Sequence, residues 1–98
     1  MWLLIDDCRD LGNLIARDGE TGLTILRLLK GKLEGVMLDH DLGYGISGYQ
    51  VMVTALEEDI LPDRVQLVTS NPVGRIAMKQ TLEANGYVCR DNVNWIKQ

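Results

Sequence analysis

Hydrophobic residues in this sequence form short runs that end abruptly at polar residues. The clearest run is Trp2-Leu3-Leu4-Ile5, and similar runs span residues 35–38 and 65–69. A strand that is apolar on both faces is typical of the middle of a parallel sheet covered by helices. We therefore expect three central strands at residues 2–5, 35–38 and 65–69.

The segments between these runs carry the signals of helices. Apolar residues recur at helical spacing, and each segment follows a residue whose side chain can accept a hydrogen bond from a free backbone N–H group. Ser47, the cap of the second predicted helix, forms a capping box with Gln50 three residues later. The predicted caps and helices are Asp18 with residues 19–30, Ser47 with residues 48–59, and Ser70 or Asn71 with residues 72–84.

Three other segments give weaker signals. Residues 13–16 are either an edge strand or the start of a helix, and we favour the strand. Residues 87–89 are expected to form a last short strand, and residues 90–98 a polar tail whose Trp95 and Ile96 fold back onto the body. Strands that alternate with helices predict a parallel sheet. The predicted fold is therefore α/β, a flavodoxin-like three-layer sandwich with a mostly parallel sheet of four or five strands and helices on both faces.

Composition narrows the class of protein. The 98 residues suit one domain, expected to span residues 1–98, with an aliphatic core because phenylalanine is absent. The net charge of −4 argues against general binding to duplex nucleic acid, which needs clustered cations. Two cysteines are too few for a disulfide scaffold, which favours a reducing compartment. With no apparent signal peptide or membrane span, we expect a cytoplasmic protein, monomeric or a small homo-oligomer.

Ionisable and polar residues follow each predicted central strand. In the expected flavodoxin-like strand order the strands at residues 2–5 and 35–38 are neighbours, so the side chains at their carboxyl ends would border one crevice. Buried charges of this kind usually bind a cation or a phosphate or move protons, although charged turns and helix caps are also common. The residues are Asp6 and Asp7 after the first strand, Asp39, His40 and Asp41 after the second, and Ser70 and Asn71 after the third.

Carboxylates in this number repel one another and need a cation. Oxygen ligands suit Mg²⁺ or Mn²⁺ better than zinc. The helix that begins at Pro72 would present its amino-terminal N–H groups, which favour a phosphate, to the same edge of the sheet. Ser70 adds a hydroxyl and Arg75 a charge that opposes the helix dipole unless an anion binds. Arg9 either joins the site or pairs on the surface with Asp7 or Asp10.

An acidic pair, a later aspartate and a hydroxyl residue after the next strand resemble the receiver domains of response regulators. The resemblance implies a metal-binding pair at Asp6 and Asp7, a phosphoacceptor at Asp39 and a phosphate-contacting hydroxyl at Ser70 or Thr69. Two features depart from that family. Cys89-Arg90 stands where receivers carry a lysine, and the chain has no room for a full helix between its first two strands.

A closer resemblance covers nearly the whole chain. Asp-Asp-x-Arg at residues 6–9, Leu-Asp-His-Asp-Leu-Gly at residues 38–43 and Ser-x-Pro-x-Gly-Arg at residues 70–75 are similar to the cyclic-phosphate processing receiver domains. That family is predicted to act on cyclic phosphates of nucleotides or RNA ends. Members commonly carry a histidine before the serine, but Thr69 stands there in this chain, which leaves His40 as the imidazole for acid–base work.

We expect a metal-dependent phosphoesterase that acts on a cyclic or terminal phosphate of a nucleotide or an RNA end. The alternatives are a non-catalytic receiver, used in phosphoacceptor signalling, and a sensor that binds a cyclic nucleotide without cleaving it. Asp39 serves as a metal ligand or attacks phosphorus itself. The expected site assigns the metal to Asp6, Asp7 and Asp39, catalysis to Asp39, His40 and Asp41, and the phosphate to Arg9, Ser70, Asn71 and Arg75.

Overall fold

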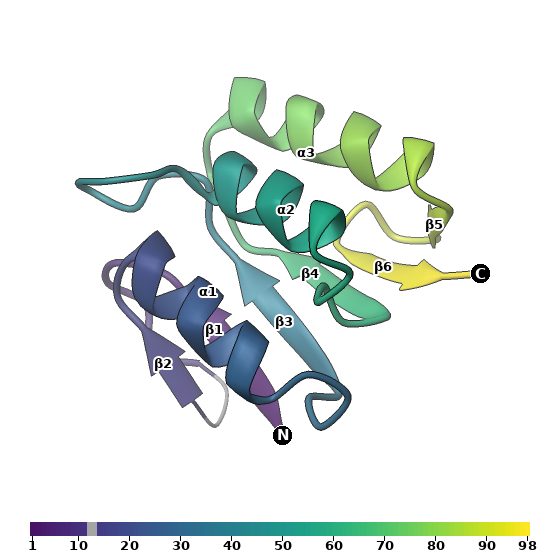
Figure 1. The fold of residues 1–98 in the computed structure, drawn as a ribbon. Coiled ribbons are helices and arrows are strands. Elements are labelled where there is room, and N and C mark those ends of the chain that lie inside the picture. The colour runs from purple at the N-terminus through teal and green to yellow at the C-terminus, as the bar shows by residue number, and fades with distance from the viewer. Residues whose placement is uncertain (12–13) are drawn as a thin grey trace.

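The computed structural model describes residues 1–11 and 14–98, which form six strands and three helices (Figure 1). In chain order the elements are β1 (Trp2–Ile5), β2 (Leu14–Ala16), α1 (Gly19–Leu28), β3 (Gly35–Leu38), α2 (Gly48–Glu57), β4 (Arg64–Leu67), α3 (Pro72–Ala84), β5 (Tyr87–Cys89) and β6 (Asn94–Lys97).

The strands form one sheet in the order β2-β1-β3-β4-β6-β5. The first four strands in this order are parallel, whereas β6 runs antiparallel to both β4 and β5. The α/β class is confirmed, and so is the predicted adjacency of the strands at residues 2–5 and 35–38, in the flavodoxin-like order 2-1-3-4. The predicted count of four or five strands is wrong, because residues 94–97 form a sixth strand. The favoured edge strand is confirmed as β2, although Asn13 lies outside the described residues.

Helices α1, α2 and α3 all lie on the same face of the sheet (Figure 1). Each helix connects parallel strands in the same direction across the sheet, and right-handed crossovers place such helices on one face. The connection from β1 to β2 runs in the opposite direction, and its described residues contain no helix. The prediction of a three-layer sandwich with helices on both faces is therefore wrong, and the described residues form two layers.

The burial of the strands follows this arrangement. Alternate residues such as Leu3 and Ile5 belong to the core beneath the helices, together with Leu38 and Leu67. The intervening positions point to the other face, where Ile96 is 43 % exposed. The sheet thus keeps a partly apolar face that no described helix covers.

Local signals determine where the helices begin. The Asp18 side chain accepts a hydrogen bond from the backbone N–H of Thr21 at the start of α1, and Ser47 forms the predicted capping box with Gln50 before α2. At α3 the side chain of Asn71 is the cap, and Pro72 is the first helical residue. These caps confirm the predicted starts of the helices.

The carboxyl-terminal segment differs from the expected tail. Asp91 accepts hydrogen bonds from the backbone N–H groups of Val93 and Asn94, and this turn reverses the chain into β6. Trp95 on β6 is buried in the core, whereas Ile96 is exposed on the other face. The polar tail predicted at residues 90–98 is therefore wrong in part, because β6 inserts between β4 and β5. None of the helices in the described residues has the length and apolar character needed to cross a membrane.

Candidate functional site

The candidate site begins where β1 and β3 end side by side. Ile5 pairs with Leu38, so the next residues, Asp6 and Asp39, leave the sheet at the same level. The backbone N–H of Asp39 donates to the carbonyl of Ile5 at 3.0 Å. Asp6 is fully buried and Asp39 is 5 % exposed. Strand order thus brings together two carboxylates that lie 33 positions apart in the sequence.

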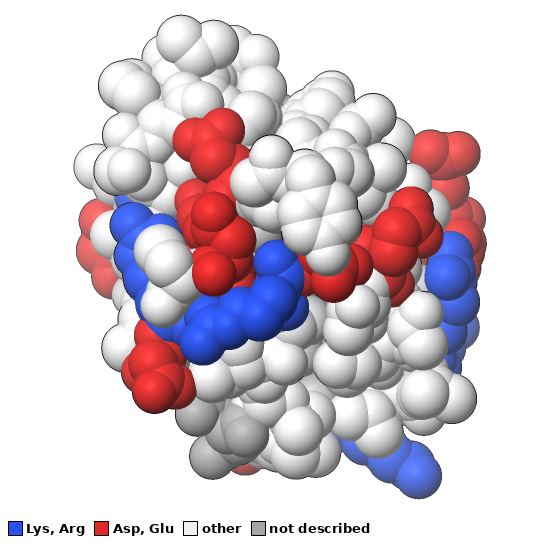
Figure 2. Space-filling model, turned by 90° about the vertical axis from the view of Figure 1, so that its left-hand side faces the viewer, with Lys and Arg blue, Asp and Glu red and all other residues white. Residues whose placement is uncertain are grey.

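Arg9 joins these two carboxylates. Its Nη1 donates to Oδ2 of Asp6 at 2.8 Å and to Oδ2 of Asp39 at 3.4 Å. Its backbone N–H also donates to Oδ1 of Asp6 at 3.0 Å. Of the two alternatives for Arg9, the structure places it in the site, in an ion pair with Asp6 and Asp39, and not in a surface pair with Asp7 or Asp10. Figure 2 shows acidic and basic side chains gathered next to one another on one side of the molecule.

The two carboxylates differ in their surroundings. Burial alone would raise the pKa of Asp6, but the backbone N–H groups of Arg9 and Cys8 and the Arg9 guanidinium outweigh it and lower that pKa. For Asp39, burial and the nearby charge of Asp6 raise the pKa, against the hydrogen bonds from Thr69 and His40. Asp6 is the more firmly ionised carboxylate, and Asp39 is the more basic one.

Thr69 connects Asp39 to the start of α3. The Thr69 hydroxyl lowers the pKa of the nearby Asp39 carboxyl group, and it accepts a hydrogen bond from the backbone N–H of Asn71 at 3.1 Å. Thr69 is buried, whereas Ser70 is exposed. Of the two hydroxyl residues considered from the sequence, Thr69 is therefore the one in contact with the buried carboxylates.

His40 and Asp41 form a second part of the site. The His40 Nδ1 lies 3.1 Å from Oδ1 of Asp41, and the Asn71 side-chain amide lies 3.3 Å from each Asp41 oxygen. Hydrogen bonds from His40 and then from Asn71 lower the pKa of Asp41. When Nδ1 carries the proton toward Asp41, the lone pair of Nε2 is available as a base.

Glycine at position 74 makes room for the imidazole ring. A Cβ atom at Gly74 would lie 2.4 Å from Cγ of His40, so a side chain on the first turn of α3 would displace the ring. The backbone N–H of His40 donates to Oδ1 of Asp39 at 2.8 Å. The histidine and the buried carboxylates therefore belong to one hydrogen-bonded network.

Arg75 lies outside this network. Its guanidinium donates to the carbonyl oxygens of Asn92 at 2.8 Å and of Leu67 and Thr69 at 3.3 Å each. These carbonyls belong to the end of β4 and to the turn before β6. The structure thus places Arg75 against the backbone, away from the two carboxylates.

The donor set suits a hard divalent cation. Oxygen atoms of Asp6 and Asp39 converge on a single nitrogen of Arg9, and Asp7 and Cys8 each offer a ligand atom within 4.8 Å of Asp6. Carboxylate oxygens are the ligands preferred by Mg²⁺ and Mn²⁺. Asp6 and Asp7 belong to the compact group of potential ligands, and Asp39, which lies outside that group and shares Arg9 with Asp6, could complete a site for such an ion.

A shallow groove of about 310 Å³ opens beside His40 and Asp41. The loop that precedes α2 forms its wall, and Tyr44 on this loop is 76 % exposed. Flat aromatic side chains next to phosphate sites offer a stacking surface for a nucleobase. Neither Tyr44 nor the groove was part of the site expected from the sequence.

Arg17 is another residue that the sequence did not reveal. Its Nη1 donates to the carbonyl oxygen of Arg9 at 2.6 Å and to that of Asp6 at 3.3 Å. It follows β2 directly and holds the backbone that carries both partners of the ion pair. Arg17 belongs to no recognisable motif in the sequence. Its contact becomes visible only in the structure, where the pairing of β2 with β1 brings Arg17 next to the loop after β1.

Comparison with known proteins agrees with this geometry. The sequence profile of a family described as "Cyclic-phosphate processing Receiver domain" matches residues 1–84, which include every residue of the network described above. Neither a curated protein nor a solved structure matches the chain. Since the profile covers 84 of 98 residues, this chain belongs to the family of cyclic-phosphate processing receiver domains.

Proposed function

We propose that this receiver domain is a metal-dependent phosphoesterase that opens or removes a cyclic or terminal phosphate of a nucleotide or an RNA end. The observation that carries the proposal is the single network that joins a histidine–carboxylate pair, His40 and Asp41, to two buried carboxylates, Asp6 and Asp39. A purely structural cluster has no need of a half-buried imidazole whose Nδ1 is held by a carboxylate.

The metal, Mg²⁺ or Mn²⁺, would be held by Asp6 and Asp39, with Asp7 as a further ligand. When bound, it supplies positive charge that polarises the phosphoryl group. The remaining chemistry falls to the side chains. In the hydrolysis of a cyclic phosphate, a bond forms between a water oxygen and phosphorus, and one phosphorus–oxygen bond to the sugar breaks.

His40 moves the proton in this reaction. Its Nε2 takes the proton of the attacking water and returns one to the departing sugar oxygen. Asp41 keeps Nδ1 protonated and stabilises the imidazolium, and Asn71 holds Asp41 in place. The amino-terminal N–H groups of α3 provide partial positive charge for the phosphate.

The substrate class rests on two further features. The groove beside His40 and Asp41 lies at the lower end of the size range of small-molecule pockets. Tyr44 on its wall offers a ring on which a base can stack. A nucleotide or the last nucleotide of an RNA strand fits both features better than inorganic phosphate alone.

The test is an assay of turnover. Purified protein with Mg²⁺ or Mn²⁺ is incubated with cyclic mononucleotides, cyclic oligonucleotides and RNA that ends in a 2′,3′-cyclic phosphate, and the products are followed by ³¹P NMR. We expect turnover that Asp39→Asn and His40→Gln abolish and that Asp10→Asn, an exposed acid in the same loop as Arg9, leaves unchanged.

The assay also separates the alternatives. Binding of a cyclic nucleotide without turnover would identify a sensor. Stable phosphorylation of Asp39 by a small phosphodonor, without turnover of any ester, would identify a phosphoacceptor module. Either result would refute the proposed phosphoesterase.

A further inference from the structure

The guanidinium of Arg9 lies between two buried carboxylates, where a positive charge offsets their mutual repulsion. Asp6 and Asp39 both lie almost entirely out of solvent, and Nη1 of Arg9 is bonded to one oxygen of each. Among the described residues, no other Lys or Arg side chain forms an ion pair with either carboxylate. Because two buried anions share one cation, the cluster keeps one negative charge that is not neutralised.

A divalent ion and this guanidinium cannot occupy the same place. Both need the oxygen atoms that face the space between Asp6 and Asp39, and two cations this close repel each other strongly at low dielectric. Binding of Mg²⁺ to these carboxylates therefore requires that the Arg9 head group leaves them. The energy of the ion pair then opposes the binding of the metal.

Arg9 is built so that only its head group moves. Its backbone N–H is bonded to Asp6, and its carbonyl accepts a hydrogen bond from Arg17 at 2.6 Å. Its side chain is 35 % exposed, in contrast to the fully buried carboxyl group of Asp6. A long side chain on a fixed backbone position keeps its charge near the site after it has left the carboxylates.

A phosphate gives the released guanidinium a new partner. Arginine binds phosphoryl oxygens through two parallel N–H groups, a geometry that a carboxylate shares. We propose that Arg9 is an exchangeable cation, which partly neutralises Asp6 and Asp39 while no metal is bound and transfers to the phosphoryl oxygens of the substrate when a divalent ion displaces it. This inference rests on the proposed function and concerns the regulation of the same site.

The exchange couples the two ligands. Metal alone must break the ion pair, whereas metal together with phosphate gives Arg9 a replacement for it. Phosphate should therefore strengthen the binding of Mg²⁺ by more than direct coordination explains, and the reverse should hold equally. The device keeps the buried carboxylates partly neutralised between substrates and favours loading of the metal when a phosphate is present.

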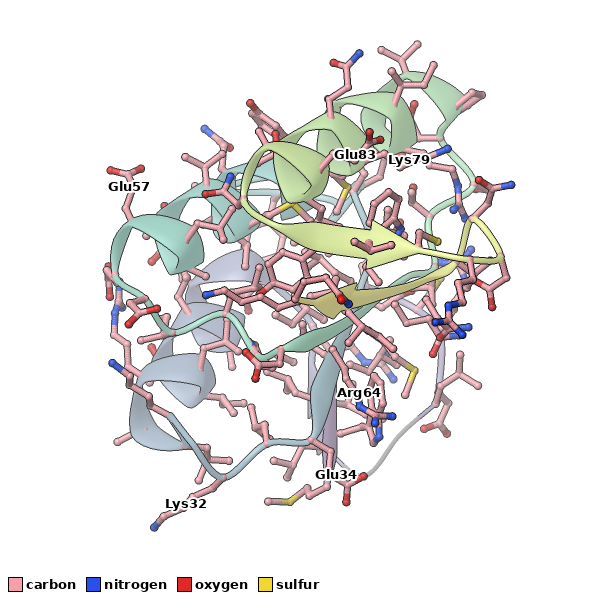
Figure 3. All side chains as sticks on the ribbon, turned by 90° about the vertical axis from the view of Figure 1, so that its right-hand side faces the viewer. Lys32, Glu34, Glu57, Arg64, Lys79 and Glu83 are labelled. Carbon is pink, nitrogen blue, oxygen red and sulfur yellow. The ribbon has the colours of Figure 1, made fainter. Side chains whose placement is uncertain are left out.

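The experiment measures Mg²⁺ binding by isothermal titration calorimetry, with and without inorganic phosphate, at about pH 8, well above the ordinary pKa of an aspartate. Wild-type protein is compared with Arg9→Ala. The matched control is Arg64→Ala, which removes the same charge at the opposite end of the sheet, where β4 begins and Arg64 lies near Glu34 (Figure 3).

We expect Arg9→Ala to bind Mg²⁺ alone at least about threefold more tightly than wild type, since the competing ion pair is gone. Phosphate should strengthen Mg²⁺ binding less in Arg9→Ala than in wild type, and Arg64→Ala should behave as wild type. If the alanine variant does not fold, NMR of the Arg9 guanidinium in the wild-type protein replaces it. Its N–H signals should shift on addition of Mg²⁺ and shift again with phosphate.

The possible failures are distinguishable. Mg²⁺ binding that is equal or weaker in Arg9→Ala, or guanidinium signals that Mg²⁺ does not move, would overturn the exchange and leave the proposed function standing. Absence of Mg²⁺ binding in wild type and in Arg9→Ala, with phosphate present, would overturn the metal site of the proposed function and the exchange with it.

Discussion

Replacing Arg75 by alanine tests whether this residue serves the backbone or the phosphate. From the sequence, a cation on the first turn of α3 opposes the helix dipole, so its removal should stabilise the ligand-free protein slightly. In the structure its guanidinium donates to three carbonyl oxygens, two at the end of β4 and one in the turn that leads to β6. These contacts predict the opposite sign.

The magnitudes decide between the two effects. Relief of the dipole would contribute about 0.3–1 kcal/mol to stability. A hydrogen bond that involves a charged group contributes about 1.5–3 kcal/mol when it is well formed. Two of the three contacts are long, at 3.3 Å, and the third lies on an exposed turn, so we assign roughly 2–3 kcal/mol to the set. We therefore expect a net loss of about 1–3 kcal/mol.

Thermal and urea unfolding of the ligand-free protein measure this loss. Each kcal/mol lowers the Tm of a domain of this size by about 4–8 °C. Lys79→Ala is the matched control, because it removes the same charge from the same helix and breaks only one exposed contact, at 3.4 Å to Asn92. It should change stability by less than about 0.5 kcal/mol. An unchanged or higher Tm for Arg75→Ala would show that the carbonyl contacts contribute little and would return Arg75 to the candidates for phosphate binding.

Three further predictions follow from the site and the turn. Asp39→Asn in the presence of EDTA should raise the free energy of unfolding measured in urea, because it removes the excess negative charge beside Asp6; a loss of stability would contradict this account. Asp41→Asn should lower turnover by roughly 10²-fold or more while leaving Mg²⁺ affinity unchanged, because His40 loses the group that fixes its proton; equal turnover would exclude the pair from catalysis. Hydrogen bonds from Asn94 and Val93 in the turn before β6 lower the pKa of Asp91 in the folded protein. The contribution of Asp91 to the stability of the protein is therefore complete above the ordinary pKa of an aspartate, and it is lost as the pH falls through the lower pKa of the folded protein. Urea unfolding of Asp91→Asn should therefore show the largest deficit near neutral pH and a shrinking one in acid, and a deficit that grows in acid would refute the assignment.

Features that depend on neighbours in the sequence were predictable. Asp18 and Ser47 cap their helices through bonds to residues three positions later, so a short stretch of sequence contains the whole interaction. The adjacency of β1 and β3 follows from general rules for parallel sheets, and it predicts that Asp6 and Asp39 meet. Local and topological rules together suffice for the position of the buried carboxylates.

Features that depend on distant partners were not predictable in this way. The sequence shows Arg75 near a helix dipole, but it does not show the carbonyl of Asn92, which reaches Arg75 only because β6 inserts beside β4. β6 pairs with β4 in the position that buries Trp95 in the core, and the sequence alone does not show which strand β6 will pair with. The proximity of Thr69 to Asp39 likewise depends on the backbone conformation of the two residues that follow β4.

The described residues between β1 and β2 form no helix, and this accounts for the uncovered face of the sheet and bears on the ion pair of Arg9. A right-handed crossover from β1 to β2 would place a helix on the face opposite to α1, α2 and α3, so a connection without a helix leaves that face uncovered. The same short connection keeps Asp6 and Arg9 at the edge of the sheet, where Arg17 at the end of β2 holds both backbone carbonyls. The family profile ends with α3, before β5 and β6, and so includes every residue of the network, whereas the turn before β6 contacts Arg75 through the carbonyl of Asn92. Two backbone contacts therefore hold Arg9 beside the carboxylates: its N–H group donates to Asp6, and its carbonyl accepts from Arg17.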